Sequence, residues 1–87
     1  MPRVSYFFGI SIRMYADEGI HHRPHFHAKY GEYSASFGFD GQLIAGSLPA
    51  AQLRLVSQWA QLHQSELAAN WAHIGRGEHV EKIDPLT

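Results

Sequence analysis

Two alternating segments meet at a Gly-Glu dipeptide in His25-Phe26-His27-Ala28-Lys29-Tyr30-Gly31-Glu32-Tyr33-Ser34-Ala35-Ser36-Phe37. Alternation with a period of two is typical of a β-strand that buries one face. A glycine as the first of two central residues is typical of a type II′ hairpin turn. Residues 25–37 therefore predict an antiparallel hairpin that turns at Gly31-Glu32.

This turn determines which residues lie opposite each other in the hairpin. One face receives apolar and aromatic pairs: Tyr30 with Tyr33, Ala28 with Ala35 and Phe26 with Phe37. The other face receives polar and small pairs: Lys29 with Ser34, His27 with Ser36 and His25 with Gly38. A slip by one residue would mix the two faces, so we expect this register. The small residues would leave room above the histidines.

One more strand is expected on each side of the hairpin. Residues 4–15 alternate over their whole length and predict a single strand, with a bulge or bend at Gly9. Residues 16–24 are expected to form a loop. Asp40-Gly41 predicts a second two-residue turn, which pairs Phe37 with Ile44 and returns residues 42–46 as the last strand.

Residues 50–74 contain neither proline nor glycine, and their apolar residues recur at steps of three and four. This pattern predicts one helix of about 25 residues that begins after Pro49. A break near Gln64-Ser65 stays open, because Ser65 could cap a second helix. Residues 79–86 are expected to be extended and docked through Val80, Ile83 and Leu86.

Together these elements predict a single α+β domain over residues 1–87. A four-stranded antiparallel meander would pack its apolar face against one long C-terminal helix, followed by a short extended tail. The expected contacts join the sheet residues Phe26, Ala28, Tyr33, Phe37 and Ile44 to the helix residues Leu53, Val56, Ala60, Leu67 and Trp71.

Composition excludes some classes of function. The net charge of −1 and the pI near 6.6 argue against a domain held on nucleic acid by bulk charge alone. The chain has no cysteine, and therefore no disulfide and no thiolate ligand. The apolar run at residues 4–15 has no cleavage signal and is too short for a bilayer. We expect a cytoplasmic protein with no membrane partner.

Four of the seven histidines lie within residues 21–27. His25 and His27 leave the same face of a strand, so both rings could reach one ion, and His22 or His21 could supply a third ligand. This reading predicts a site for Zn²⁺ or another divalent metal on His22, His25 and His27. The alternative without chemistry is a solvated sheet face on which the histidines are ordinary polar residues.

A second chemical reading needs no metal. If residues 4–15 lie antiparallel beside the hairpin, Arg13 shares a face with His25, His27 and Lys29. Metal-free RNA cleavage needs a base, an acid and a cation for the developing charge. His25 and His27 would exchange the proton in such a site, while Arg13 and Lys29 would hold the phosphate.

Several stretches resemble a small bacterial family, domain of unknown function 4160. The most distinctive is Pro24-His25-Phe26-His27 followed by Tyr30-Gly31-Glu32. The resemblance also covers MPRVSYFFGISIRMY, GSLPAAQLRLVSQWAQLHQSELAANW and EKIDPL, including the helix residues Val56, Trp59, Glu66, Leu67 and Trp71. Members tend to be encoded beside another small protein, in a pairing that looks like a toxin–antitoxin module. The resemblance implies a bacterial, cytoplasmic protein with that partner and transfers no catalytic assignment.

The functional expectation is therefore a component of a toxin–antitoxin-like pair, with a histidine-centred site that acts as a metal-independent RNase. The alternative is a non-catalytic module that binds a divalent metal or another protein. A helix longer than the sheet would also leave apolar surface around Leu67, Trp71 and Ile74. That surface would suit a homodimer or the adjacent partner.

Overall fold

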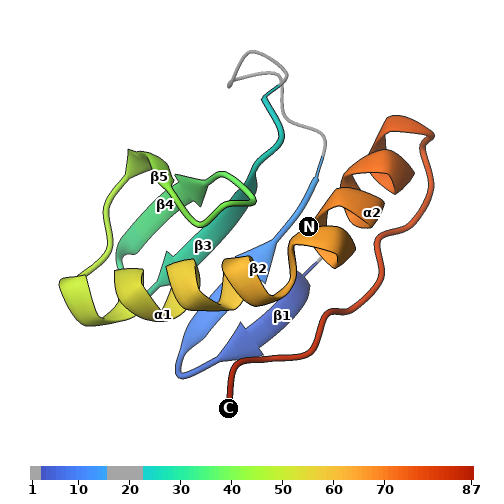
Figure 1. The fold of residues 1–87 in the computed structure, drawn as a ribbon. Coiled ribbons are helices and arrows are strands. Elements are labelled where there is room, and N and C mark those ends of the chain that lie inside the picture. The colour runs from blue at the N-terminus through green and yellow to red at the C-terminus, as the bar shows by residue number, and fades with distance from the viewer. Residues whose placement is uncertain (1–2, 16–22) are drawn as a thin grey trace.

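The computed structural model describes residues 3–15 and 23–87. It contains a five-stranded antiparallel sheet in the sequential order β1-β2-β3-β4-β5, followed by two helices. Figure 1 shows α1 crossing one face of the sheet, and the C-terminal tail running from the end of α2 back to the β1 side. The elements are β1 (Arg3–Phe7), β2 (Ile10–Arg13), β3 (Phe26–Tyr30), β4 (Tyr33–Phe37), β5 (Leu43–Gly46), α1 (Ala50–Leu62) and α2 (Gln64–Gly75).

The prediction of four strands is wrong, because the strand expected at residues 4–15 is a hairpin. Phe8 and Gly9 have φ angles of 49° and 81°, the positive values that both central residues of a type I′ turn require. The turn shifts the phase of alternation, and a bulge between Arg3 and Ser5 shifts it once more. The two shifts cancel, so the buried residues Val4 and Ile10 are separated by an even number of positions. The sequence therefore looks like one continuous alternating strand.

The β3–β4 hairpin has the predicted register. Its pairs run from Tyr30 opposite Tyr33 to Phe26 opposite Phe37. Gly31 has a φ of 56°, as the first position of a type II′ turn requires. The predicted pairing of Phe37 with Ile44 is wrong, because a bulge at Ile44 of β5 places Phe37 opposite Leu43.

The prediction of one long helix is also wrong. His63 lies between α1 and α2 with φ −126° and ψ 30°, outside the helical region. Its Nδ1 lies 2.5 Å from Oε1 of Glu66, and its ring packs on Trp59. A straight continuation would carry the second half past the sheet, whereas the break allows Leu67 to be fully buried.

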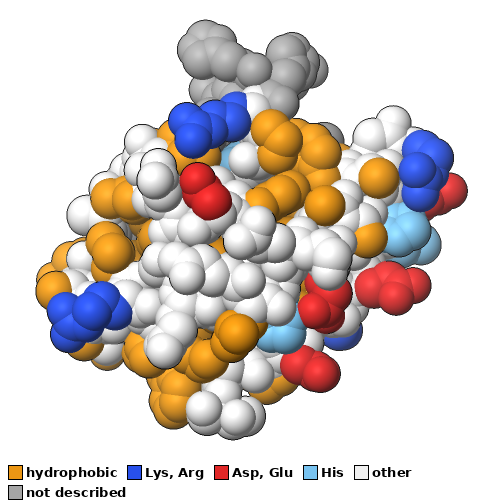
Figure 2. All heavy atoms as spheres, in the orientation of Figure 1, with side chains coloured by type: hydrophobic (Ala, Val, Ile, Leu, Met, Phe, Trp, Pro, Cys, Tyr) orange, Lys and Arg blue, Asp and Glu red, His pale blue; other side chains and the backbone are white. Residues whose placement is uncertain are grey.

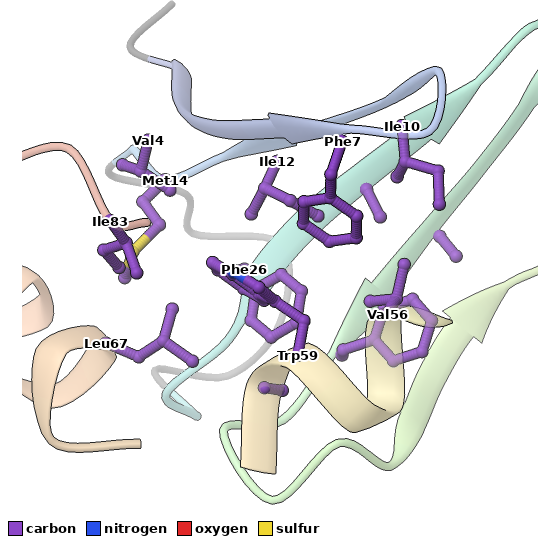
Figure 3. Packing of buried hydrophobic residues seen from close by; sticks show 14 of the residues in the cluster. Val4, Phe7, Ile10, Ile12, Met14, Phe26, Val56, Trp59, Leu67 and Ile83 are labelled. Carbon is purple, nitrogen blue, oxygen red and sulfur yellow. The ribbon is translucent and has the colours of Figure 1, made fainter. Parts of the chain in front are cut away.

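Trp59 lies at the centre of the hydrophobic core, where side chains of β1, β2 and β3 meet both helices (Figure 3). Its ring centroid is 5.5 Å from those of Phe7 and Phe26, and its indole N–H donates to the carbonyl oxygen of Asp84. Phe26 and Phe37 are buried as expected, whereas Tyr33 is largely exposed.

The C-terminal tail completes this core. Ile83 is buried, and its backbone N–H donates to the carbonyl oxygen of Val4 at 2.7 Å. Val80 and Leu86 pack against the core, as do the partly buried Trp71 and Ile74. Because Trp71 and Ile74 are only partly buried, some apolar surface remains exposed there, and the expected homodimer stays a prediction. Among the described residues, no helix has both the length and the apolar character that a membrane span needs.

Candidate functional site

Two rows of side chains lie on the face of the sheet opposite to α1. The strand registers align Arg13 with His27 and Ser36 in one row. They align Ser11 with Lys29 and Ser34 in the next row. Directly paired residues point to the same side of a sheet, so these rows share one face. The expected neighbourhood of Arg13, His27 and Lys29 follows from this register.

A pocket of about 410 Å³ opens on this face. Its walls are Arg13, Tyr15, His27, Ala28, Lys29 and Ser34. A larger hollow of about 580 Å³ follows α1, but its walls include one charged side chain, Arg54, and no histidine. The sheet-face pocket is therefore the better candidate for chemistry, because it combines cations with a group that transfers protons near neutral pH.

His27 is held on two sides within this pocket. Its ring stacks on that of Tyr15, with centroids 4.6 Å apart and an interplanar angle of 10°. Its Nδ1 lies 3.2 Å from the hydroxyl oxygen of Ser36, within hydrogen-bond distance. A ring held in this way keeps one orientation, with Nδ1 toward Ser36 and Nε2 buried.

His25 does not line the pocket, although it was expected beside His27 on the open face. It is 1% exposed, and its Nδ1–H donates to the carbonyl oxygen of Arg23 at 2.6 Å. Its ring packs edge-on against Trp71 of α2, with centroids 5.2 Å apart. The same ring lies 5.0 Å from that of His27. His25 is therefore a buried residue that contacts both His27 in the pocket wall and Trp71 on α2.

The charged side chains of the strands are all cationic. None of the residues that the structure assigns to the five strands is Asp or Glu, whereas Arg3, Arg13 and Lys29 lie on them. On the helix side, shown in Figure 2, most of the visible Asp and Glu side chains lie over α2 and the tail, and several Lys and Arg side chains lie on the same side. The three strand cations give the sheet a local positive charge, which suits an anion.

The predicted three-histidine metal site is not described as a whole. His21 and His22 lie outside the described residues. Within residues 3–15 and 23–87 no group of three His, Cys, Asp or Glu side chains is arranged to hold a metal ion. The rings of His25 and His27 lie close together, with centroids 5.0 Å apart, but a zinc site on them would need a third ligand from elsewhere. A metal site on His22, His25 and His27 remains a prediction.

Two polar wall residues were not proposed as site residues from the sequence. Tyr15 and Ser34 line the pocket beside Arg13 and Lys29. Both have the strand parity of the chosen residues, which was the available signal. What parity does not give is the stacking of Tyr15 on His27 across neighbouring strands.

The sequence of this chain matches the model of one known protein family. The model of the family described as Domain of unknown function (DUF4160) matches residues 9–72. This segment extends from the β1–β2 turn into α2 and includes every wall residue of the pocket. No curated protein and no solved structure matches the chain. The chain belongs to the family of domain of unknown function DUF4160.

Proposed function

We propose that this protein binds RNA in the sheet-face pocket and cleaves it without a metal ion, as one component of a toxin–antitoxin-like pair in the bacterial cytoplasm. One observation carries the proposal: Arg13, His27 and Lys29 line the same pocket on a face whose strands hold no carboxylate. Two fixed cations favour a phosphate, and the imidazole beside them supplies a proton acceptor.

The reaction follows from these three groups. His27 accepts the proton of the ribose 2′-hydroxyl at Nε2, which is buried and must be uncovered by a local movement as RNA binds. The 2′ oxygen then forms a bond to phosphorus. The bond from phosphorus to the 5′ oxygen breaks, and that oxygen takes up a proton from water. Arg13 and Lys29 stabilise the charge that develops on the phosphate oxygens. The products are a 2′,3′-cyclic phosphate and a 5′-hydroxyl end.

His25 has a different role in this proposal from His27. Its burial against Trp71 keeps it from contact with a strand of RNA, so we assign it as a positioning residue. It supports the ring of His27 from below, at a centroid distance of 5.0 Å. Removing it would disturb cleavage through the orientation of His27 and would also weaken the fold.

The second candidate function is binding of a divalent metal such as Zn²⁺ without catalysis. The proximity of the His25 and His27 rings favours it, with His22 as the third ligand. In that case the pocket would serve protein interaction, with the small adjacent partner or with a second copy of the chain.

Untagged protein distinguishes these functions. Elemental analysis gives the metal content, and cleavage of a labelled RNA is measured with and without chelator. The RNase predicts cleavage that resists chelator, yields 2′,3′-cyclic phosphate and falls by at least about a hundredfold in His27→Gln. Arg54→Gln is the matched control for Lys29→Gln. Lys29 lines the sheet-face pocket, whereas Arg54 lines the hollow along α1, so only Lys29→Gln removes a cation from the proposed site. Stoichiometric zinc without cleavage would support the alternative.

A further inference from the structure

The basic face continues past the pocket onto β1. Arg3 lies opposite Arg13, and Tyr6 lies opposite Ser11, so both belong to the two rows of the open face. The guanidinium carbon of Arg3 lies 4.8 Å from the ring centroid of Tyr6. The bulge between Arg3 and Ser5 brings these two side chains to the same side of the strand.

Tyr6 is one of three large hydrophobic side chains that are exposed on the described strands, with Tyr33 and Leu43. It is 53% exposed, although β1 otherwise contributes Val4 and Phe7 to the core. The contact of Tyr6 with Arg3 is a cation–π pair that leaves about half of the tyrosine exposed beside a positive charge. Tyr15, just after the end of β2, and His27 of β3 form a second aromatic pair on the same face.

We infer that the open face binds single-stranded RNA across β1, β2 and β3, with bases stacked on Tyr6 and Tyr15 and phosphates held by Arg3, Arg13 and Lys29. The inference rests on the proposed function, whose substrate it specifies. Antiparallel sheets that bind RNA stack two or three unpaired bases on exposed aromatic rings. Stacking is tolerant of sequence because every base has a flat face.

A duplex fits this surface poorly. Its bases are already stacked on one another, and its flat faces are not available to Tyr6. Arg3 and Arg13 lie opposite each other in one row on β1 and β2, and Lys29 lies in the next row on β3, so the three cations form a stepped line across adjacent strands about 4.8 Å apart. A line of cations beside aromatic rings tracks the backbone of a single strand.

The test uses a dye-labelled 2′-O-methyl RNA, which binds without being cleaved because its 2′ oxygens are blocked. Fluorescence anisotropy compares this strand with its duplex. We expect the single strand to bind at least about tenfold more tightly than the duplex. Tyr6→Leu should weaken single-strand binding by at least about fivefold and leave duplex binding unchanged, whereas Tyr6→Phe should retain it.

Tyr33→Leu is the matched control. Tyr33 is 46% exposed, but it pairs with Tyr30 and has the strand parity of the buried Ala35 and Phe37, away from the open face. Its substitution should leave the affinity unchanged, and circular dichroism confirms that each variant is folded. Equal affinity for strand and duplex, or equal effects of Tyr6→Leu and Tyr33→Leu, would overturn the inference.

The outcome separates this inference from the proposed function. Tight binding of the single strand without cleavage of ordinary RNA would contradict the RNase and leave the binding surface intact. Cleavage of a dinucleotide substrate without preference for single strands would support the RNase and contradict the extended surface.

Discussion

The side-chain amide of Asn70 pairs with both backbone groups of Glu81. Its Nδ2–H donates to the Glu81 carbonyl oxygen at 2.8 Å, and its Oδ1 accepts the Glu81 N–H at 2.8 Å. Asn70 is 2% exposed, so these bonds are formed away from water. One amide on α2 thus binds the tail in the manner of a neighbouring strand.

Replacing this amide should detach the middle of the tail. Asn70→Ala leaves two backbone groups of Glu81 unpaired, and we expect the free energy of unfolding to fall by about 2–3 kcal/mol. The melting temperature should fall by roughly 10–20 °C. Urea denaturation followed by tryptophan fluorescence measures the loss. Gln61→Ala, on the exposed side of α1, should change stability by less than about 0.5 kcal/mol. Equal losses in the two variants would contradict the role of Asn70.

Two glycines should respond to alanine in opposite directions. Gly46 has a φ of 80°, and a Cβ there would meet the carbonyl oxygen of Ser34, so Gly46→Ala should destabilise the protein by roughly 2–4 kcal/mol. Gly75 is the last residue of α2 and has open space around it. Gly75→Ala should stabilise the protein by about 0.5–1 kcal/mol. Thermal unfolding of both variants gives the signs, and a shared sign would refute the reasoning.

The two strand histidines should differ in their contribution to stability. His25→Ala leaves a cavity beside Trp71 and removes the donor to the Arg23 carbonyl, so we expect a loss of about 2–4 kcal/mol. His27→Ala should lose less, on the order of 1 kcal/mol, because its ring is only half-buried. Chemical denaturation of both variants measures the difference. A larger loss for His27→Ala would show that the core does not depend on His25.

Glu78 should titrate at unusually low pH. A hydrogen bond with His73, and then one with Arg76, lowers the pKa of the Glu78 carboxyl below its ordinary value of 4.5. A carboxyl whose pKa is lower in the folded state stabilises folding above its unfolded pKa and loses that effect as the pH falls through the folded one. Carbon-13 NMR titration measures the pKa, and His73→Ala should raise it. An unchanged pKa in that variant would disprove the assignment.

Local sequence rules predicted the β3–β4 hairpin because the Gly31-Glu32 turn and two independent alternations agree on one register. They failed at residues 4–15, where a bulge and a turn each shift the phase and together restore it. They also predicted one helix and left a break near Gln64-Ser65 only open, because no proline or glycine marks the break at His63. The contacts of His63 with Trp59 and Glu66 accompany that break, and both are local, at spacings of four and three residues.

The neighbourhood of the candidate site was predictable to the extent that strand parity determines it. Arg13 and Lys29 share the pocket with His27 because pairing between adjacent strands conserves the face. The burial of His25 was not predictable, because it depends on Trp71 arriving from a second helix. The position of Tyr6 on the open face was not predictable either, because it depends on the bulge in β1 and on the turn that separates β1 from β2.

The docked tail also makes the two borders of the sheet unequal. On β1, the carbonyl oxygen of Val4 accepts a hydrogen bond from the Ile83 N–H, and that of Arg3 accepts one from Nζ of Lys82. At the other border, β5 pairs with a described strand on one side only. Fibrous growth by strand addition requires two accessible borders on every copy. A molecule with one can add a single strand and then stop. The tail thus obstructs strand addition at the start of β1 and leaves β5 as the more accessible border of the sheet.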